Sequence, residues 1–255
     1  MSILKRLLEH PLTAGLSVDD PRTTELRIEI IRSKPFLRSI YHEWYESIIT
    51  SLPEKRNNLL ELGSGAGSLK ELLPNMITSE VFQTPGVELI ADARNLPLTN
   101  ESLDAIVMTD VFHHIPNVSQ FLSEAVRCIR PGGKILMVEP WHTPWSHWVY
   151  THLHPEPFIT NGDWEIPQAG PLSGANGALP WIVFMRDRER FELENPQLKI
   201  KVIKPIMPIA YLFSGGISMR SLMPGWAYKL TRAVESALWQ EKWAMFAFIE
   251  LERVA

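Results

Sequence analysis

The feature that most constrains this chain is a glycine-rich loop that directly follows a short apolar run. The run extends from Leu59 to Leu62, and the loop reads Gly63-Ser64-Gly65-Ala66-Gly67. Glycine lets the backbone take conformations, and approach a ligand, in ways that a Cβ atom prevents. From Ser68 the pattern is that of an amphipathic helix, whose first turn would present free N–H groups. The stretch therefore predicts a strand, a tight turn and a helix start at a site for a nucleotide-like ligand.

The spacing of the three glycines narrows the class of ligand. In the dinucleotide-binding fingerprint the third glycine comes three residues after the second, whereas this chain has Ser68 there and its third glycine is Gly67. With Glu61 just before the loop, the pattern becomes E-x-G-x-G-x-G, which resembles motif I of the class I methyltransferases that use S-adenosyl-L-methionine (SAM). A glycine loop without any ligand is the alternative. The resemblance implies that SAM contacts Glu61, Gly63, Ser64, Gly65 and Gly67.

The length of the chain bears on the number of domains, and its charge bears on whether it binds nucleic acid. A chain of 255 residues with 45% apolar residues is enough for one α/β domain with additions. The formal net charge is −4 and the sequence has no long basic run, so we do not expect a nucleic-acid partner.

Cysteine usage and hydropathy bear on the cellular compartment. The single cysteine, Cys128, cannot form an intrachain disulfide, which favours a reducing, cytoplasmic setting. The N-terminus contains Lys5, Arg6 and Glu9 and lacks the apolar core of a signal peptide. Because proline and glycine interrupt the most apolar stretches, 168–185 and 205–219, we expect no transmembrane segment.

Hydrophobic periodicity predicts alternating strands and helices. A helical stripe begins at Phe36 and ends at Pro53, and further helices are predicted over 118–130, 186–191 and 226–239. Residues 1–22 show no sustained periodicity and are predicted to form an arm with one short helix. Besides 59–62, the predicted strands cover residues 76–81, 87–92, 103–109, 134–139, 198–205 and 243–251.

Acidic residues follow several of these predicted strands. Glu80 ends the second strand, where a carboxylate can accept hydrogen bonds from both ribose hydroxyls of an adenosyl group. Asp92 and Ala93 follow the third strand, at the place where the family resemblance implies a contact with the adenine amino group. Asp110 follows the fourth strand and is expected to line the cofactor site. An ordinary exposed glutamate at 80 and an exposed turn aspartate at 92 are the alternatives.

The order of weaker motifs strengthens the resemblance. Leu96-Pro97 forms a turn, His113-His114 follows the fourth strand, and Arg130-Pro131-Gly132-Gly133 precedes the fifth. Together with the glycine loop, this succession over residues 58–140 resembles the type 11, ubiquinone-biosynthesis-like branch of the SAM-dependent methyltransferases. It implies a doubly wound, Rossmann-like α/β fold with seven strands, mostly parallel, of which the last is antiparallel.

The resemblance also implies a division of the chain. We expect an N-terminal helical cover at 1–52, a SAM-binding core at 53–140, a lid insertion for the substrate at 141–197, and the rest of the sheet at 198–255. The insertion is rich in tryptophan, histidine and proline. Aromatic rings there could form a platform for a ligand, although packing of the lid onto the core explains most of them. Its histidines at 142, 147, 152 and 154 have irregular spacing, so we expect no metal site.

Methyl transfer needs an acceptor held in line with the methyl group and, for a hydroxyl acceptor, a base. Histidine suits that role. His114 is the first candidate for a base or acceptor-orienting group, with His142 second. The alternative is that the histidine pair only caps its loop.

Three functions remain open from the sequence. The favoured one is methyl transfer from SAM, most simply to oxygen, on a small-molecule, saccharide or lipid-linked acceptor. The apolar loop within 205–225 would allow weak contact with a membrane surface. The others are an inactive SAM-binding regulator and an NAD-dependent Rossmann oxidoreductase.

Overall fold

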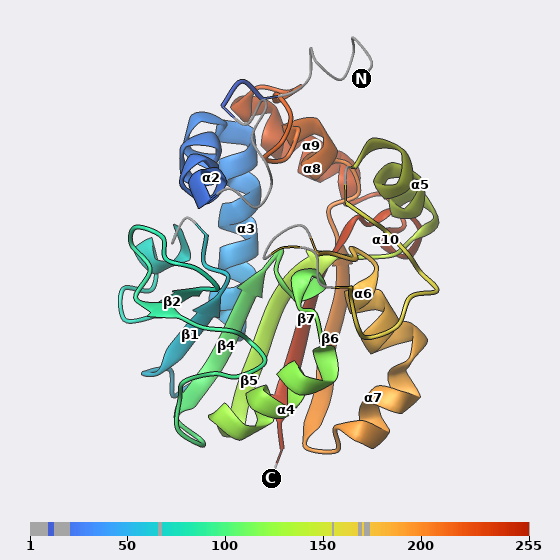
Figure 1. The fold of residues 1–255 in the computed structure, drawn as a ribbon. Coiled ribbons are helices and arrows are strands. Elements are labelled where there is room, and N and C mark those ends of the chain that lie inside the picture. The colour runs from blue at the N-terminus through green and yellow to red at the C-terminus, as the bar shows by residue number, and fades with distance from the viewer. Residues whose placement is uncertain are drawn as a thin grey trace.

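A seven-stranded sheet forms the centre of the structure, a computed structural model that describes residues 10–12, 21–65, 68–154, 156–167, 170 and 174–254 (Figure 1). The strand order is β3-β2-β1-β4-β5-β7-β6. The first five strands in this order are parallel to one another, whereas β7 is antiparallel to both β5 and β6. The strands are β1 Leu59–Leu62, β2 Ile77–Glu80, β3 Leu89–Ile90, β4 Leu103–Thr109, β5 Ile129–Pro140, β6 Leu198–Ile206 and β7 Phe246–Arg253. This confirms the expected fold class.

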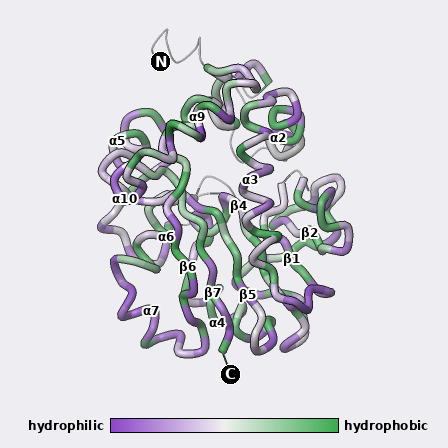
Figure 2. The backbone as a smooth tube through the Cα atoms, turned by 180° about the vertical axis from the view of Figure 1, so that it is seen from behind, coloured by the Kyte–Doolittle hydropathy of each residue, from purple (hydrophilic) through white to green (hydrophobic). Residues whose placement is uncertain are grey.

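Helices cover both faces of the sheet. In Figure 1, α4 (Val118–Cys128) lies in front of the sheet and α3 (Pro35–Ser51) lies behind it. The predicted stripe of α3 is buried from Phe36 to Ile48, with Trp44 only 1% exposed. Because β4 is covered on both faces, its residues 103–108 are all buried, as its nearly continuous apolar run predicts. Figure 2 shows hydrophobic residues along the central strands and hydrophilic residues along α7 (Arg188–Glu194).

Two predictions about helices were wrong. The helix expected from Ser68 is a single 3₁₀ turn, η1 (Ser68–Glu71), because Pro74 follows three residues later and cannot continue a helix. Conversely, α2 (Pro21–Ser33) occupies a stretch where no such helix was predicted. Proline at a first helical position is a common start signal, and Pro21 is that signal here.

The insertion after β5 contains several short helices. The first, α5 (Pro144–Leu153), begins with a capping box in which Thr143 and Ser146 each accept the other's backbone N–H. Then follow α6 (Leu179–Trp181), a π-helical turn η3 (Ile182–Arg186), and α7, which lies beside the lower half of the sheet in Figure 1. Trp141 and Trp164 are buried in the core, and Trp148 is half exposed.

The C-terminal part completes the sheet and adds helices at its upper end. These are α8 (Ala210–Ser214), a 3₁₀ turn η4 (Gly225–Ala227), α9 (Tyr228–Glu235) and α10 (Gln240–Trp243). The last strand begins at Phe246 instead of Trp243, because residues 240–243 form α10. Within the described part of the chain, no helix is long and apolar enough to cross a bilayer.

Candidate functional site

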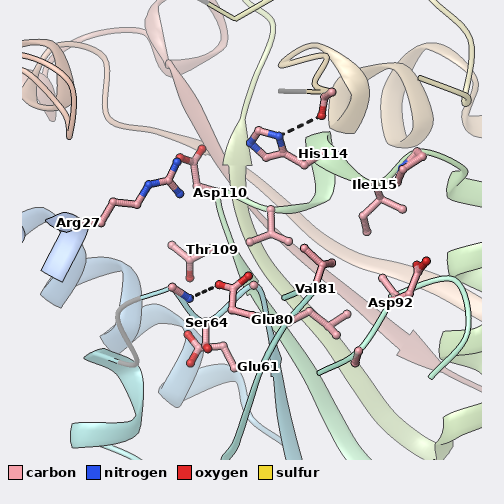
Figure 3. Close-up of a pocket in the computed structure, with 18 of the residues that line it drawn as sticks. Arg27, Glu61, Ser64, Glu80, Val81, Asp92, Thr109, Asp110, His114 and Ile115 are labelled. Carbon is pink, nitrogen blue, oxygen red and sulfur yellow. Dashed lines mark hydrogen bonds between the residues drawn. The ribbon is translucent and has the colours of Figure 1, made fainter. Parts of the chain in front are cut away.

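A cavity of about 430 Å³ opens where β1, β2 and β4 end (Figure 3). The carboxyl ends of parallel strands are the usual ligand-binding edge of open α/β sheets. The cavity collects nearly all residues that were predicted from the sequence to bind the cofactor, together with the first catalytic candidate: Glu61, Gly63, Ser64, Gly65, Glu80, Asp92, Ala93, Asp110 and His114. The remaining predicted residue, Gly67, lies outside the described residues.

The glycine loop has a backbone that needs its glycines. Gly63 has φ +61°, and a Cβ atom there would lie 2.6 Å from Cγ2 of Val111. Gly65 has φ +49° and open space beside it, so this part of the main chain borders the cavity directly. The loop is tied to β2, because the N–H of Gly65 donates to Oε1 of Glu80 at 2.6 Å.

Several buried polar atoms around the cavity lack a partner among the described residues. They are Oε2 of Glu61, Oγ of Ser64 and Oγ1 of Thr109. An unpaired buried polar atom is costly, and a ligand is one way to satisfy it. Burial, followed by the nearby charge of Glu80, raises the pKa of Glu61 to about 8. A cationic donor with hydroxyl and amino groups, such as SAM, fits this set of acceptors.

Asp92 is placed at the far side of the cavity but already has a partner. Its two carboxylate oxygens accept hydrogen bonds from the side chain of Arg94, the shortest at 2.7 Å. This hydrogen bonding lowers the pKa of Asp92, so the carboxylate is ionised at neutral pH. An adenine amino group at this position would share the carboxylate with Arg94.

A buried charge cluster lies directly after β4. His113 is 1% exposed, and its Nδ1 lies 2.8 Å from Oε2 of Glu139 while its Nε2 lies 3.5 Å from Oε2 of Glu156. Burial opposes the charged ring, but these two carboxylates raise the pKa of His113 well above its ordinary value. The other oxygen of Glu139 accepts the N–H groups of Val111 and Phe112, both at 2.8 Å. Glu139 therefore fixes the loop that carries the histidine pair.

The two candidate catalytic histidines differ in position. His114 lines the cavity, and its Nδ1 lies 3.2 Å from the carbonyl oxygen of Gly174. Burial and the neighbouring His113 lower the pKa of His114 to about 4, so its ring is neutral at physiological pH. If Nδ1 donates to that carbonyl, Nε2 is free to accept a proton or hydrogen bond. His142 does not line the cavity, and its ring packs 4.5 Å from that of Trp181.

Some cavity residues were not predicted from the sequence. Arg27 comes from α2, and Figure 3 shows its guanidinium pointing toward Asp110. Tyr41 and Tyr45 come from α3. If α2 had been recognised in the sequence, Arg27 would have been a candidate ligand-binding residue. A guanidinium group at the cavity can bind the carboxylate of a ligand. Glu156, which borders Asp110 in a small adjoining cavity, follows no strand and gives no sequence signal.

One group of possible metal ligands is found in the described part of the chain. A ligand atom of each of His113, His114 and Glu156 lies within 4.8 Å of the other two. In this structure His113 and Glu156 form an ion pair across part of that space. The four histidines of the insertion do not form such a group within the described residues.

Comparison with known proteins identifies the central domain. Residues 60–137 match the family model described as a methyltransferase domain. Over 85 residues the chain is 36% identical to phthiotriol/phenolphthiotriol dimycocerosates methyltransferase of Mycobacterium leprae, a match that covers 33% of this chain. The chain spans about a quarter of the length of that relative, 26%.

Solved structures share the whole fold at low identity. A geranyl diphosphate C-methyltransferase from Streptomyces coelicolor has a TM-score of 0.55 at 12% identity, covering 97% of this chain and 92% of the other. A SAM-dependent methyltransferase from Thermotoga maritima, described as a possible histamine N-methyltransferase, has a TM-score of 0.54 at 17% identity, covering 84% and 89%. The domain match confirms the resemblance to methyltransferases for residues 60–137, and the solved structures show that the chain shares the fold of SAM-dependent methyltransferases.

Proposed function

We propose that this chain, whose residues 60–137 form a methyltransferase domain of the SAM-dependent class, transfers a methyl group to an oxygen of a lipid-linked or saccharide acceptor. One observation carries the proposal. Glu61, Glu80 and Asp92 reach a single cavity from three neighbouring strands, beside a glycine loop that leaves room for a ligand. Three acidic side chains around one cavity, of which Glu61 is buried with an unpaired oxygen, suit a ligand with amino, hydroxyl and cationic groups.

The roles of the chain's residues follow from their places around the cavity. Glu80 would hold the ribose hydroxyls, Asp92 and Ala93 the adenine, and Glu61 with Ser64 and Gly65 the amino-acid part of SAM. When bound, SAM supplies a methyl group on a positively charged sulfonium. Asp110 lies between this cavity and the smaller one that Glu156 lines, so the acceptor would approach past Asp110. Positioning of this kind can remove several kcal/mol from the barrier of a direct displacement.

His114 is the residue that we propose to orient the acceptor. It lies in the same cavity as Asp110, with its Nδ1 held by the carbonyl of Gly174 and its ring neutral. The free Nε2 would accept the proton of an acceptor hydroxyl. His142 is the weaker candidate because it does not border the cavity. Residues 141–197, which supply Glu156 and Gly174, belong to the acceptor side in this proposal.

Two observations support the proposed class of acceptor: the name of a mycobacterial relative and the aromatic residues that line the two cavities. The mycobacterial relative is named for dimycocerosates, which are lipids. In this chain the cavity wall includes Tyr41, Tyr45 and Ile217, and the adjoining cavity includes Tyr150, Tyr211 and Phe246. Aromatic and aliphatic walls suit the apolar part of a lipid-linked acceptor and the faces of sugar rings.

Two measurements test the proposal. Calorimetry should show that SAM binds at one site per chain while NAD gives no heat; the reverse result would assign the cavity to a nicotinamide cofactor. Incubation with SAM labelled on its methyl group should then transfer label to a lipid alcohol, a polyprenyl-linked saccharide or a phenolic lipid. If SAM binds but no acceptor of these classes is labelled, the chain is better described as a SAM-binding regulator.

A further inference from the structure

Helix α9 is attached to the rest of the molecule through its polar side. The hydroxyl of Tyr228 donates to Oε2 of Glu43 on α3 at 2.5 Å, and Arg232 forms an ion pair with Glu43 at 2.6 Å. Arg232 also pairs with Glu235, whose carboxylate is fully buried and accepts the N–H of Ala210 at 2.5 Å. A surface helix ordinarily turns its apolar side inward, so the orientation of α9 is inverted.

The outward side of α9 is apolar. Trp226 lies in the turn η4 just before α9, and Leu230 and Val234, four residues apart, lie on one side of the helix. Their exposed fractions are 81%, 64% and 56%. Leu222, just before this stretch, and Trp239, just after it, are also exposed. We call these five residues the apolar face. An exposed patch of large apolar side chains on a natural protein usually marks a binding surface.

The exposed charges of residues 215–245, the segment that carries the apolar face, are mainly positive. Arg220, Lys229 and Lys242 are exposed, whereas Glu241 is the one exposed acid between residues 215 and 245. Lys242 also lies over the ring of Trp239, at 4.1 Å from the centroid. The chain as a whole has a formal net charge of −4, so this segment is more positively charged than the rest of the protein. Tryptophan together with lysine is the composition of helices that lie at the surface of anionic membranes.

The apolar face is also connected to the proposed donor cavity. The segment between α8 and η4 contains Ile217, which lines the cavity, and Leu222, which belongs to the apolar face. Lys34, between α2 and α3, fixes this segment because its ammonium group donates to the carbonyl oxygens of Gly216 and Met219. Figure 1 shows α8 and α9 at the same end of the molecule as the carboxyl ends of the parallel strands. A surface bound to this face would lie beside the cavity.

We propose that the apolar face binds the surface of an anionic lipid bilayer and holds the cavity next to an acceptor embedded in it. The proposal deepens the proposed function, because it gives the acceptor a lipid anchor. Trp226, Leu230 and Val234 would enter the boundary between headgroups and acyl chains, while Arg220, Lys229 and Lys242 meet the phosphates. The convex side of a helix can insert into a soft bilayer without a complementary groove.

Sedimentation with vesicles tests the lipid contact. We expect the full chain to bind vesicles of phosphatidylcholine and phosphatidylglycerol, and to bind phosphatidylcholine alone at least fivefold less. The double variant Trp226→Glu/Leu230→Glu should lower the partition coefficient at least tenfold. Leu193→Glu is the control, because Leu193 is also 81% exposed and belongs to α7, which Figure 1 shows at the other end of the molecule from α9. Lys229→Gln should weaken binding and reduce its dependence on salt.

Other outcomes would overturn the proposal. It fails if the unmodified chain leaves both kinds of vesicle unbound, or if the double variant binds as well as the Leu193→Glu control. It fails equally if the chain is a dimer in sedimentation velocity that the double variant converts to a monomer, because the face then binds a second copy. Calorimetry with S-adenosylhomocysteine on the same preparations keeps the two proposals separate. Unchanged heat in the double variant shows an intact cavity, and absent heat in the unmodified chain rejects the donor site alone.

Discussion

At the scale of single residues, the buried carboxyl group of Glu61 should lower the stability of the folded protein at high pH and, when ionised, strengthen the binding of SAM. Its pKa is raised to about 8 by burial and by Glu80. The folded protein therefore holds this proton more tightly than the unfolded chain does, and the free energy of unfolding should fall as pH rises from about 4.5 to about 8. Glu61→Gln should remove that fall and raise the free energy of unfolding at pH 8.5 by about 1–2 kcal/mol. Urea unfolding at several pH values measures this.

The same substitution should weaken the binding of SAM. The donor is cationic, so its affinity should increase as pH rises through the pKa of Glu61, and Glu61→Gln should remove this dependence. Loss of a charged hydrogen-bond acceptor corresponds to a roughly tenfold or greater rise in Kd. Calorimetry with SAM measures the effect. A variant that is both more stable and equally able to bind SAM would show that Glu61 has no contact with the donor.

His114 should affect turnover and leave donor binding unchanged. Because it lines the cavity near Asp110 and stays neutral, His114→Asn should lower kcat by about 10²–10⁴ without a change in the Kd of SAM. His142→Asn, outside the cavity lining, is the control and should stay within a few-fold of the unmodified chain. Activity that depends on His114 should be constant from pH 6 to 8 and should fall below about pH 5. If the two variants behave alike, His114 is not the orienting residue.

At the scale of elements, the strands followed from the sequence better than the short helices did, although β5 begins at Ile129 and includes residues 130–133, which were predicted to precede it. The nearly continuous apolar run 103–109 is typical of a strand buried on both faces, and β4 was predicted at its observed bounds. The turn η1 was predicted too long because periodicity continued while Pro74 stopped the helix. Helix α2 was not predicted, because Pro21 was interpreted as the end of an N-terminal arm and not as the start of a helix. With α2 unrecognised, Arg27 could not be placed, although Glu80 and Asp92 could.

Helix α2 should contribute to the donor site through Arg27. Its guanidinium reaches the cavity from the end opposite Asp92 and would meet the carboxylate of SAM. Arg27→Ala should weaken SAM about tenfold or more, corresponding to a lost charged hydrogen bond of about 1.5–3 kcal/mol. Methylthioadenosine, which lacks the amino-acid part, should bind both proteins equally. An equal loss for both ligands would mean that Arg27 supports the fold of α2 and makes no contact with the carboxylate.

At the scale of the whole molecule, the matched domain is smaller than the folding unit. Residues 60–137 end within β5, whose other edge pairs with β7 from Lys134 to Pro140. A chain truncated after residue 197 would lose β6 and β7 and expose that edge. We expect it to aggregate and to lack a cooperative unfolding transition, as measured by gel filtration and circular dichroism. A monomeric, cooperatively unfolding fragment would show that the last two strands are dispensable.

At this scale the sequence predicted which acidic residues gather at the sheet edge. It did not predict the long-range ion pairs that hold the site together. Carboxylates after successive parallel strands must meet at one sheet edge, so Glu61, Glu80 and Asp92 were placed from spacing and resemblance. His113 forms ion pairs with Glu139 and Glu156, which come from separate segments of the chain. No periodic pattern in the sequence indicates that these segments meet. The inverted orientation of α9 likewise depends on Glu43, which lies on another helix far along the chain.

A crystal structure of the full chain with S-adenosylhomocysteine tests the central claim most directly. We expect one molecule in the cavity at the ends of β1, β2 and β4, with its ribose hydroxyls on Glu80, its adenine beside Asp92 and Ala93, and its sulfur facing Asp110 and His114. An empty cavity, or a ligand bound at another edge of the sheet, would contradict the assignment of this site and of the proposed methyl transfer.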